Sequence, residues 1–152
     1  MTARMGNPAL VVPGAMAALI AVGKTVTATG ISERTLELVH IRASQINGCG
    51  VCLDMHHKIA KKLGETDDRI HVIAGWRDTP YFSDAERAAL ALAEAVTRVA
   101  DRSNAVPDDV YEEAARHYDE EQLAALLLSI SMVNVWNRIN LATHQQAGTP
   151  WA

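Results

Sequence analysis

The sequence lacks the features that stabilise small secreted proteins or that bind nucleic acids. It has only two cysteines in 152 residues, and a chain of this length buries enough apolar surface to fold without disulfide bonds. It contains no run of lysine or arginine and no glycine-rich phosphate-binding pattern, and its formal net charge is −4, so we expect no nucleic-acid partner. No apolar stretch reaches the ~20 residues of a membrane span. We therefore expect one domain over residues 1–152, in a reducing cytoplasm and without a membrane partner.

Patterns typical of strands are equally scarce. Alternating residues rich in Val, Ile and Thr are absent apart from residues 24–29, which we interpret as a linker. The apolar stretch at residues 9–22 is interrupted by Pro13 and Gly14, which argues against the core of a signal peptide. We expect it to form a first helix that packs on the core or on a partner subunit. The chain is thus expected to be all-α, a helical bundle.

Helical spacing and helix-end residues predict the remaining elements. Ser32 is a suitable N-cap and Gly48 a suitable C-cap for the helix between them. Gly64 ends the next helix, and Ser83 with Glu86 forms the pattern of a capping box. A proline begins the helix after that, and a second capping-box pattern begins the last one. The expected helices span residues 32–47, 49–63, 67–74, 83–100, 107–117 and 119–143.

The last of these helices is apolar nearly all round, which is typical of a central helix or of an oligomer interface. Asn134, Asn137 and Arg138 interrupt it on adjoining faces. Two interpretations remain open for these polar residues. They form hydrogen bonds to loop ends or a subunit contact, or they form the polar edge of a pocket.

The stretch Gly48–His57 contains the side chains that are most suited to chemical reactivity. Its two cysteines, Cys49 and Cys52, lie three apart at the start of a helix and can reach each other to form a disulfide. A helix N-terminus places unpaired backbone N–H groups and partial positive charge beside them, which favours the reactive thiolate.

Two further side chains are candidates for proton transfer. His56 lies four residues after Cys52, on the same helix face, and can accept the thiol proton. This favours Cys52 as the activated thiol and Cys49 as its partner, although the helix dipole alone favours Cys49. Glu37 lies twelve residues before Cys49 on the preceding helix. A carboxylate there can exchange protons with His56 through water if the two helices pack as a hairpin, but spacing alone does not distinguish it from Glu33.

Other interpretations of these residues are available. The cysteines also fit two small buried core residues. His40, three residues after Glu37, can contact it, whereas His57 lies on another helix face and is expected in solvent. A zinc site is the remaining alternative, and its four ligands would be a carboxylate, Cys49, Cys52 and His56.

The spacing of four of these residues resembles a family motif. Glu37, Cys49, Cys52 and His56 reproduce the pattern Glu-x11-Cys-x2-Cys-x3-His. This pattern resembles the core motif of the AhpD-like alkylhydroperoxidases in the carboxymuconolactone decarboxylase superfamily. Residues 46–49 and 52–56 also resemble the sequences of that family. The resemblance extends from residue 32 through the last helix, where it includes Asn134, Trp136, Asn137 and Arg138.

The resemblance implies an all-helical fold that assembles into homo-oligomers, often trimers or hexamers. It also implies a thiol peroxidase or disulfide reductase cycle used in antioxidant defence. In that cycle Cys52 attacks the hydroperoxide and becomes a sulfenic acid, and Cys49 resolves it to the disulfide. Glu37 and His56 would form the proton relay. An external thiol or disulfide reductant would regenerate the dithiol, and neither an organic cofactor nor a metal is needed.

One residue departs from the family pattern. The best-characterised branch has a further histidine just before the second cysteine, where this sequence has Val51. The relay would be one group shorter, which weakens the case for efficient peroxide reduction. The alternatives are a thiol-disulfide oxidoreductase with little peroxidase activity and a zinc-binding or purely interacting subunit. The decarboxylase branch lacks the cysteine pair, so we do not expect that activity.

Overall fold

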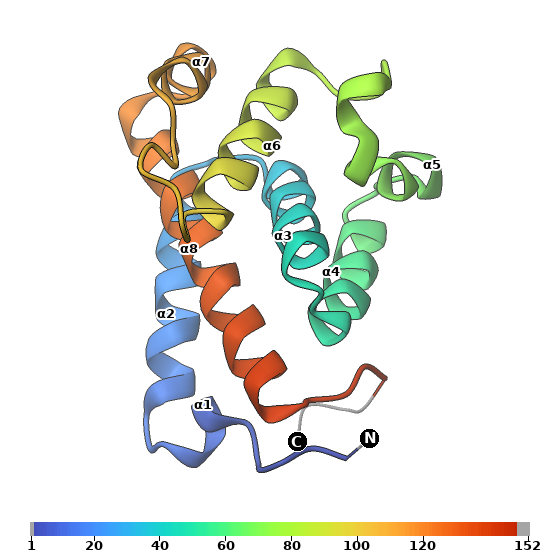
Figure 1. The fold of residues 1–152 in the computed structure, drawn as a ribbon, viewed down its shortest axis with the longest axis vertical. Coiled ribbons are helices and arrows are strands. Elements are labelled where there is room, and N and C mark those ends of the chain that lie inside the picture. The colour runs from blue at the N-terminus through green and yellow to red at the C-terminus, as the bar shows by residue number, and fades with distance from the viewer. Residues whose placement is uncertain (1, 149–152) are drawn as a thin grey trace.

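The structure, a computed structural model that describes residues 2–148, is built from helices, and no strand occurs in this part of the chain. The prediction of an all-α fold is therefore confirmed. The elements are α1 (Pro8–Val11), α2 (Ala15–Ala28), α3 (Glu33–Asn47), α4 (Gly50–Lys62), α5 (Asp67–His71), the 3-10 helix η1 (Ile73–Asp78), α6 (Asp84–Thr97), α7 (Asp108–His117) and α8 (Glu120–Thr143) (Figure 1).

Helix α3 lies at the centre and packs against α4, α6 and α8 (Figure 1). Leu36 and Val39 face a cluster formed with α6 and α8. Leu38 and Ile41 face a second cluster, formed with α4, α6 and η1. Because α3 buries side chains on both faces, polar residues between these positions also become enclosed.

Most of the expected helix ends are found in the structure. The Ser32 side chain accepts a hydrogen bond from the backbone of Thr35, and Gly48 adopts the left-handed conformation at φ 74°. Ser83 and Glu86 form both halves of the capping box. At α8 only half is present, since Asp119 caps the helix without a reciprocal bond from its third residue. The proline at position 107 lies one residue before its helix, as the N-cap.

The interpretation of residues 24–29 as a linker is wrong. Residues up to Ala28 form the last turns of α2. The side-chain hydroxyls of Thr25 and Thr27 donate to backbone carbonyls three residues earlier, at 2.7 and 3.1 Å. Val26 packs in the cluster shared with α6 and α8. Branched residues lower helix propensity only slightly, and tertiary packing outweighs that preference here.

Asparagines of α8 form hydrogen bonds with the C-terminal end of α3. The Asn47 side chain donates to Asn134 at 2.9 Å and to Asn137 at 2.8 Å. Asn137 in turn donates to the Ser44 hydroxyl at 3.1 Å. Of the two interpretations of these asparagines, hydrogen bonding to a helix end is confirmed, whereas Arg138 is exposed. These bonds fix the turn from which the cysteine-bearing helix α4 begins.

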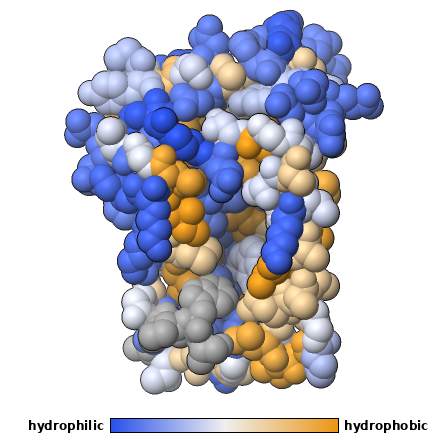
Figure 2. Space-filling model, turned by 180° about the vertical axis from the view of Figure 1, so that it is seen from behind, coloured by the Kyte–Doolittle hydropathy of each residue, from blue (hydrophilic) through white to orange (hydrophobic). Residues whose placement is uncertain are grey.

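The N-terminal helices expose much of their apolar surface. Leu10, Val11, Val12 and Ile20 are exposed, and Val26 is the buried residue of α2. Apolar residues gather at the end of the molecule where α1 and α2 lie (Figure 2). Among residues 2–148, no helix combines the length and the apolarity that crossing a membrane requires.

A buried carboxylate joins α3, η1 and α6. Glu94 accepts hydrogen bonds from Arg42 at 2.7 Å, from the Trp76 indole at 3.0 Å and from Arg77 at 2.8 Å. Burial alone would raise the pKa of Glu94, but these hydrogen bonds lower it below 4.5. Its charged form therefore stabilises the fold above pH 4.5, and this contribution is lost as the pH falls through the lower pKa of the folded state.

We expect Glu94→Gln to lower the free energy of unfolding at pH 7 by about 2 kcal/mol, since a neutral amide cannot satisfy both arginines and the indole. The difference from the unmodified protein should shrink at acid pH, where the carboxylate is itself protonated. Urea unfolding at both pH values measures the effect. Glu113→Gln is the control, because this partly exposed carboxylate of α7 pairs with residues of its own helix. Equal losses in the two variants would contradict the role of Glu94.

Candidate functional site

The two cysteines are joined by a disulfide at the start of α4, with their Cα atoms 5.3 Å apart. Cys49 is the N-cap of the helix, and its Sγ accepts a hydrogen bond from the backbone N–H of Cys52 at 3.4 Å. The left-handed Gly48 lets the chain turn sharply from α3 into α4. Cys49 is 1% exposed and Cys52 is 0% exposed. In this oxidised state both sulfurs are therefore inside the protein.

Asn140 is a neighbour of the disulfide that the sequence analysis missed. Its side-chain amide donates to Cys52 Sγ at 3.4 Å, and its Oδ1 accepts from Asn7 at 3.2 Å. Asn140 follows Asn137 by three residues, so it continues the polar stripe of α8 on the same helix face. This three-residue spacing was the sequence signal that could have identified Asn140. An amide donor at this position can stabilise negative charge on Cys52.

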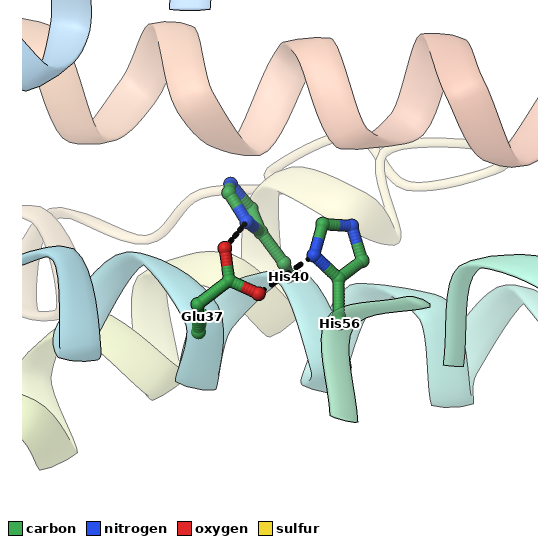
Figure 3. A group of neighbouring side chains, drawn as sticks. All are labelled: Glu37, His40 and His56. Carbon is green, nitrogen blue, oxygen red and sulfur yellow. Dashed lines mark hydrogen bonds and ion pairs between the residues drawn. The ribbon is translucent and has the colours of Figure 1, made fainter. Parts of the chain in front are cut away.

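Glu37, His40 and His56 form a hydrogen-bonded group between α3 and α4 (Figure 3). His56 Nδ1 donates to Glu37 Oε2 at 2.8 Å, and His40 Nδ1 donates to Glu37 Oε1 at 3.1 Å. Glu37 and His56 are each 7% exposed. The structure thus brings Glu37 and His56 into direct contact, without the intervening water that the sequence analysis expected, and adds His40. His57 is exposed, as expected.

The charge of Glu37 determines where the protons of the two imidazoles lie. Burial would raise the pKa of Glu37, but the hydrogen bonds from His40 and His56 outweigh burial and lower it to about 2. An ionised carboxylate only accepts hydrogen bonds, so we assign the Nδ1–H tautomer to both rings when they are neutral. Burial lowers the pKa of His40, against the effect of Glu37. In the assigned tautomer the proton of neutral His56 is on Nδ1, so its Nε2 carries a lone pair that can accept a proton.

Ser129 of α8 holds the second ring in place. Its Oγ lies 2.6 Å from His40 Nε2. With the proton of His40 on Nδ1, the Ser129 hydroxyl is the donor in this bond. Ser129 was not singled out from the sequence, because a serine in an apolar helix carries no signal of its partner.

Cys52 and His56 lie one turn apart on α4, but within residues 2–148 no hydrogen bond joins the cysteines to the Glu37, His40 and His56 group. Cys52 Sγ has Asn140 as its side-chain partner, whereas the partner of His56 is Glu37. The four ligands considered for zinc also do not come together. In the described part of the chain, the group whose atoms lie close enough to hold an ion contains Glu37, His40 and His56 but neither sulfur.

A cavity of about 230 Å³ lies between α2, α3, α4 and α8. Its walls are mostly apolar, and the polar residues that line it include Glu37, His40, His56 and Ser129, together with Thr27 and Glu33. The cysteines do not line it. The cavity therefore leads to the histidines rather than to the sulfurs.

Comparison with known proteins places these features in a family. The family model described as "Carboxymuconolactone decarboxylase family" matches residues 13–95, which include Glu37, both cysteines and His56. The uncharacterized protein YdfG of Bacillus subtilis (strain 168) is 40% identical over 139 residues, which are 91% of this chain and 93% of YdfG. The uncharacterized protein YnjA of Escherichia coli (strain K12) is 35% identical over 106 residues, covering 69% of this chain and 56% of YnjA.

Solved structures show the same fold. A protein of unknown function from Agrobacterium tumefaciens, suggested to be the antioxidant defence protein AhpD, is 33% identical with a TM-score of 0.88. That match covers 98% of this chain and 100% of the other. The debrominase Bmp8 without ligand has a TM-score of 0.77 at 24% identity, over 90% of this chain and 73% of its own. At that identity the likeness to Bmp8 concerns the fold alone.

Proposed function

Since the chain belongs to the carboxymuconolactone decarboxylase family, we propose that it is a thiol-dependent peroxidase that reduces hydroperoxides through Cys52 and Cys49, in antioxidant defence. The observation that carries this proposal is the disulfide at the start of α4, next along the helix to a buried histidine–carboxylate pair. A dithiol within one helical turn can release two electrons as it closes to a disulfide, and the disulfide can accept two electrons, with little change elsewhere in the fold. The likeness to the Agrobacterium tumefaciens protein that is suggested to be the antioxidant defence protein AhpD supports the proposed role in antioxidant defence.

In the first step the Cys52 thiolate attacks the terminal oxygen of the hydroperoxide. The O–O bond breaks, Cys52 becomes a sulfenic acid, and the departing alkoxide takes up a proton to become an alcohol. His56, protonated by the thiol of Cys52, supplies that proton. The Asn140 amide, 3.4 Å from Cys52 Sγ, favours the thiolate.

In the second step the Cys49 thiolate attacks the sulfenic sulfur and the S–O bond breaks; the departing hydroxide takes up the proton that the Cys49 thiol gave up and leaves as water, and the disulfide forms. The backbone N–H of Cys52 donates to Cys49 Sγ, so the N-cap position favours this thiolate too. An external dithiol reductant then returns two electrons and two protons. Glu37 keeps His56 oriented through the 2.8 Å hydrogen bond throughout the cycle.

The proposal includes a homo-oligomer, a trimer or hexamer, in a reducing cytoplasm. Its support is the exposed apolar surface of α1 and α2 (Figure 2), which a second copy of the chain can cover. Sedimentation analysis measures the assembly directly.

Reduced protein mixed with one equivalent of tert-butyl hydroperoxide tests the proposal. We expect the loss of two thiols per chain and the release of one equivalent of alcohol, because each cycle converts one dithiol to one disulfide. Thiol titration after denaturation measures the loss. Protein oxidised beforehand is the control. Retention of both thiols, with no alcohol formed, would contradict peroxidase activity.

A second candidate is thiol-disulfide exchange with little peroxidase activity. Two observations favour it. The cavity does not reach the sulfurs, and Val51 occupies the position of the additional relay histidine. Repeating the titration with glutathione disulfide in place of the hydroperoxide separates the two. Loss of thiols with glutathione disulfide but not with the hydroperoxide would identify the exchange activity.

A further inference from the structure

The Glu37, His40 and His56 group contains the donor types that bind transition-metal ions. One ligand atom from each residue lies within 4.8 Å of the other two. Glu37 and His40 come from α3 and His56 comes from α4, and both helices are fixed by packing in the core (Figure 3). Two imidazoles and one carboxylate are a common ligand set for zinc and for other divalent ions that accept nitrogen and oxygen donors.

We propose that Glu37, His40 and His56 bind a divalent ion of the Zn²⁺ type, with its fourth position open to the cavity. Ion binding itself does not depend on the peroxidase proposal. Its consequence does, because the ion occupies the side chains that we assign to proton transfer. Bound zinc would therefore act as an inhibitor of hydroperoxide reduction.

Two of the present distances between ligand atoms are close to those that an ion requires, and one ligand atom from each of the three residues lies within 4.8 Å of the other two. His56 Nδ1 and His40 Nδ1 lie 2.8 and 3.1 Å from the two Glu37 oxygens. Ligand atoms at the usual zinc distance of about 2.1 Å are separated by roughly 3.4 Å in a tetrahedral site. Small side-chain movements would admit the ion. Each neutral ring would move its proton from Nδ1 to Nε2, so no net proton is released.

Ser129 fits this second state as well as the first. When Nδ1 of His40 binds the ion, its Nε2 carries the proton and needs an acceptor. The Ser129 hydroxyl, 2.6 Å away, can rotate to accept it. Metal-bound histidines usually have such a partner on the other ring nitrogen, and it orients the ligand.

The cavity provides the open position. Glu37, His40 and His56 all line it, so an ion held by them would face its interior. Three protein ligands and a vacant fourth position form the arrangement in which zinc keeps a water molecule or binds an added ligand. Because the remaining walls are mostly apolar, one water or a small anion would complete the coordination.

The test is calorimetric titration of the oxidised protein with ZnCl₂. The disulfide removes both sulfurs as ligands, so binding must come from other groups. We expect one ion per chain, with binding weakened about 100-fold in His40→Gln and about 10-fold in Ser129→Ala. His57→Gln is the matched control, since this exposed histidine is next to His56 but outside the group. Its affinity should be unchanged.

Three results would overturn the site. They are the absence of zinc binding to the oxidised protein, an equal loss in His57→Gln, and binding that is confined to the reduced protein and lost in Cys52→Ser. Co²⁺ provides a second measurement, because imidazole and carboxylate ligands give visible absorption without a thiolate charge-transfer band. Zinc binding by a protein without peroxidase activity would leave the site intact and reject only the proposed function. Peroxidase activity unaffected by bound zinc would reject the inhibitory role.

Discussion

Cys52→Ser is expected to lower the rate of hydroperoxide reduction by at least about 10³-fold, because a serine hydroxyl neither ionises near neutral pH nor accepts the oxygen atom. The measurement is the consumption of tert-butyl hydroperoxide in the presence of excess dithiothreitol. The fold should be retained, since the exchanged atoms are similar in size. Far-ultraviolet circular dichroism verifies this.

Cys49→Ser is the matched control, with the same substitution at the other end of the disulfide. It retains the attacking thiol but not the resolving one. We expect one turnover that stops at a sulfenic acid on Cys52, which dimedone traps and mass spectrometry locates. If the sulfenic acid forms on Cys49 in the Cys52→Ser variant instead, the helix N-cap selects the attacking sulfur and the two roles are exchanged.

Glu37→Gln is expected to slow the reaction of the reduced protein with hydroperoxide about 10²-fold at neutral pH, the typical size of one acid–base contribution. The carboxylate accepts from both His40 and His56. A glutamine has one acceptor oxygen and an amide that donates, so at least one ring must turn or change its tautomer. Rapid mixing with detection of thiol loss measures the rate.

Glu112→Gln provides the control for Glu37→Gln, with the same change in charge at an exposed position of α7. Its rate should match that of the unmodified protein. Thermal unfolding of both variants separates chemistry from folding. Equal rates for Glu37→Gln and the unmodified protein would show that Glu37 has only a structural role.

Features fixed by neighbouring residues could be predicted from the sequence. The caps at Ser32, Gly48 and Ser83 depend on contacts within one helical turn, and all three are found where the pattern placed them. The order of the helices followed from the same signals. Residues 24–29 were misjudged because their local preference is overridden by packing against distant helices.

The site could be predicted only in part. Spacing alone did not separate Glu37 from Glu33, yet one turn of helix makes Glu37 buried and leaves Glu33 exposed. The contacts of Asn140 with Cys52 and of Ser129 with His40 join residues 88 and 89 positions apart. No local pattern encodes such pairs, because they depend on how α8 packs against α3 and α4.

The burial of the disulfide limits the rate at which the oxidised protein is reduced to the dithiol. A reducing thiolate must approach along the sulfur–sulfur axis, yet the two cysteines are 1% and 0% exposed. Reduction therefore requires a local opening that exposes one of the two sulfurs. We expect the rate of reduction to reach a maximum that extra reductant cannot raise, set by how often this opening occurs. Between such openings the disulfide would persist even in the presence of excess thiol.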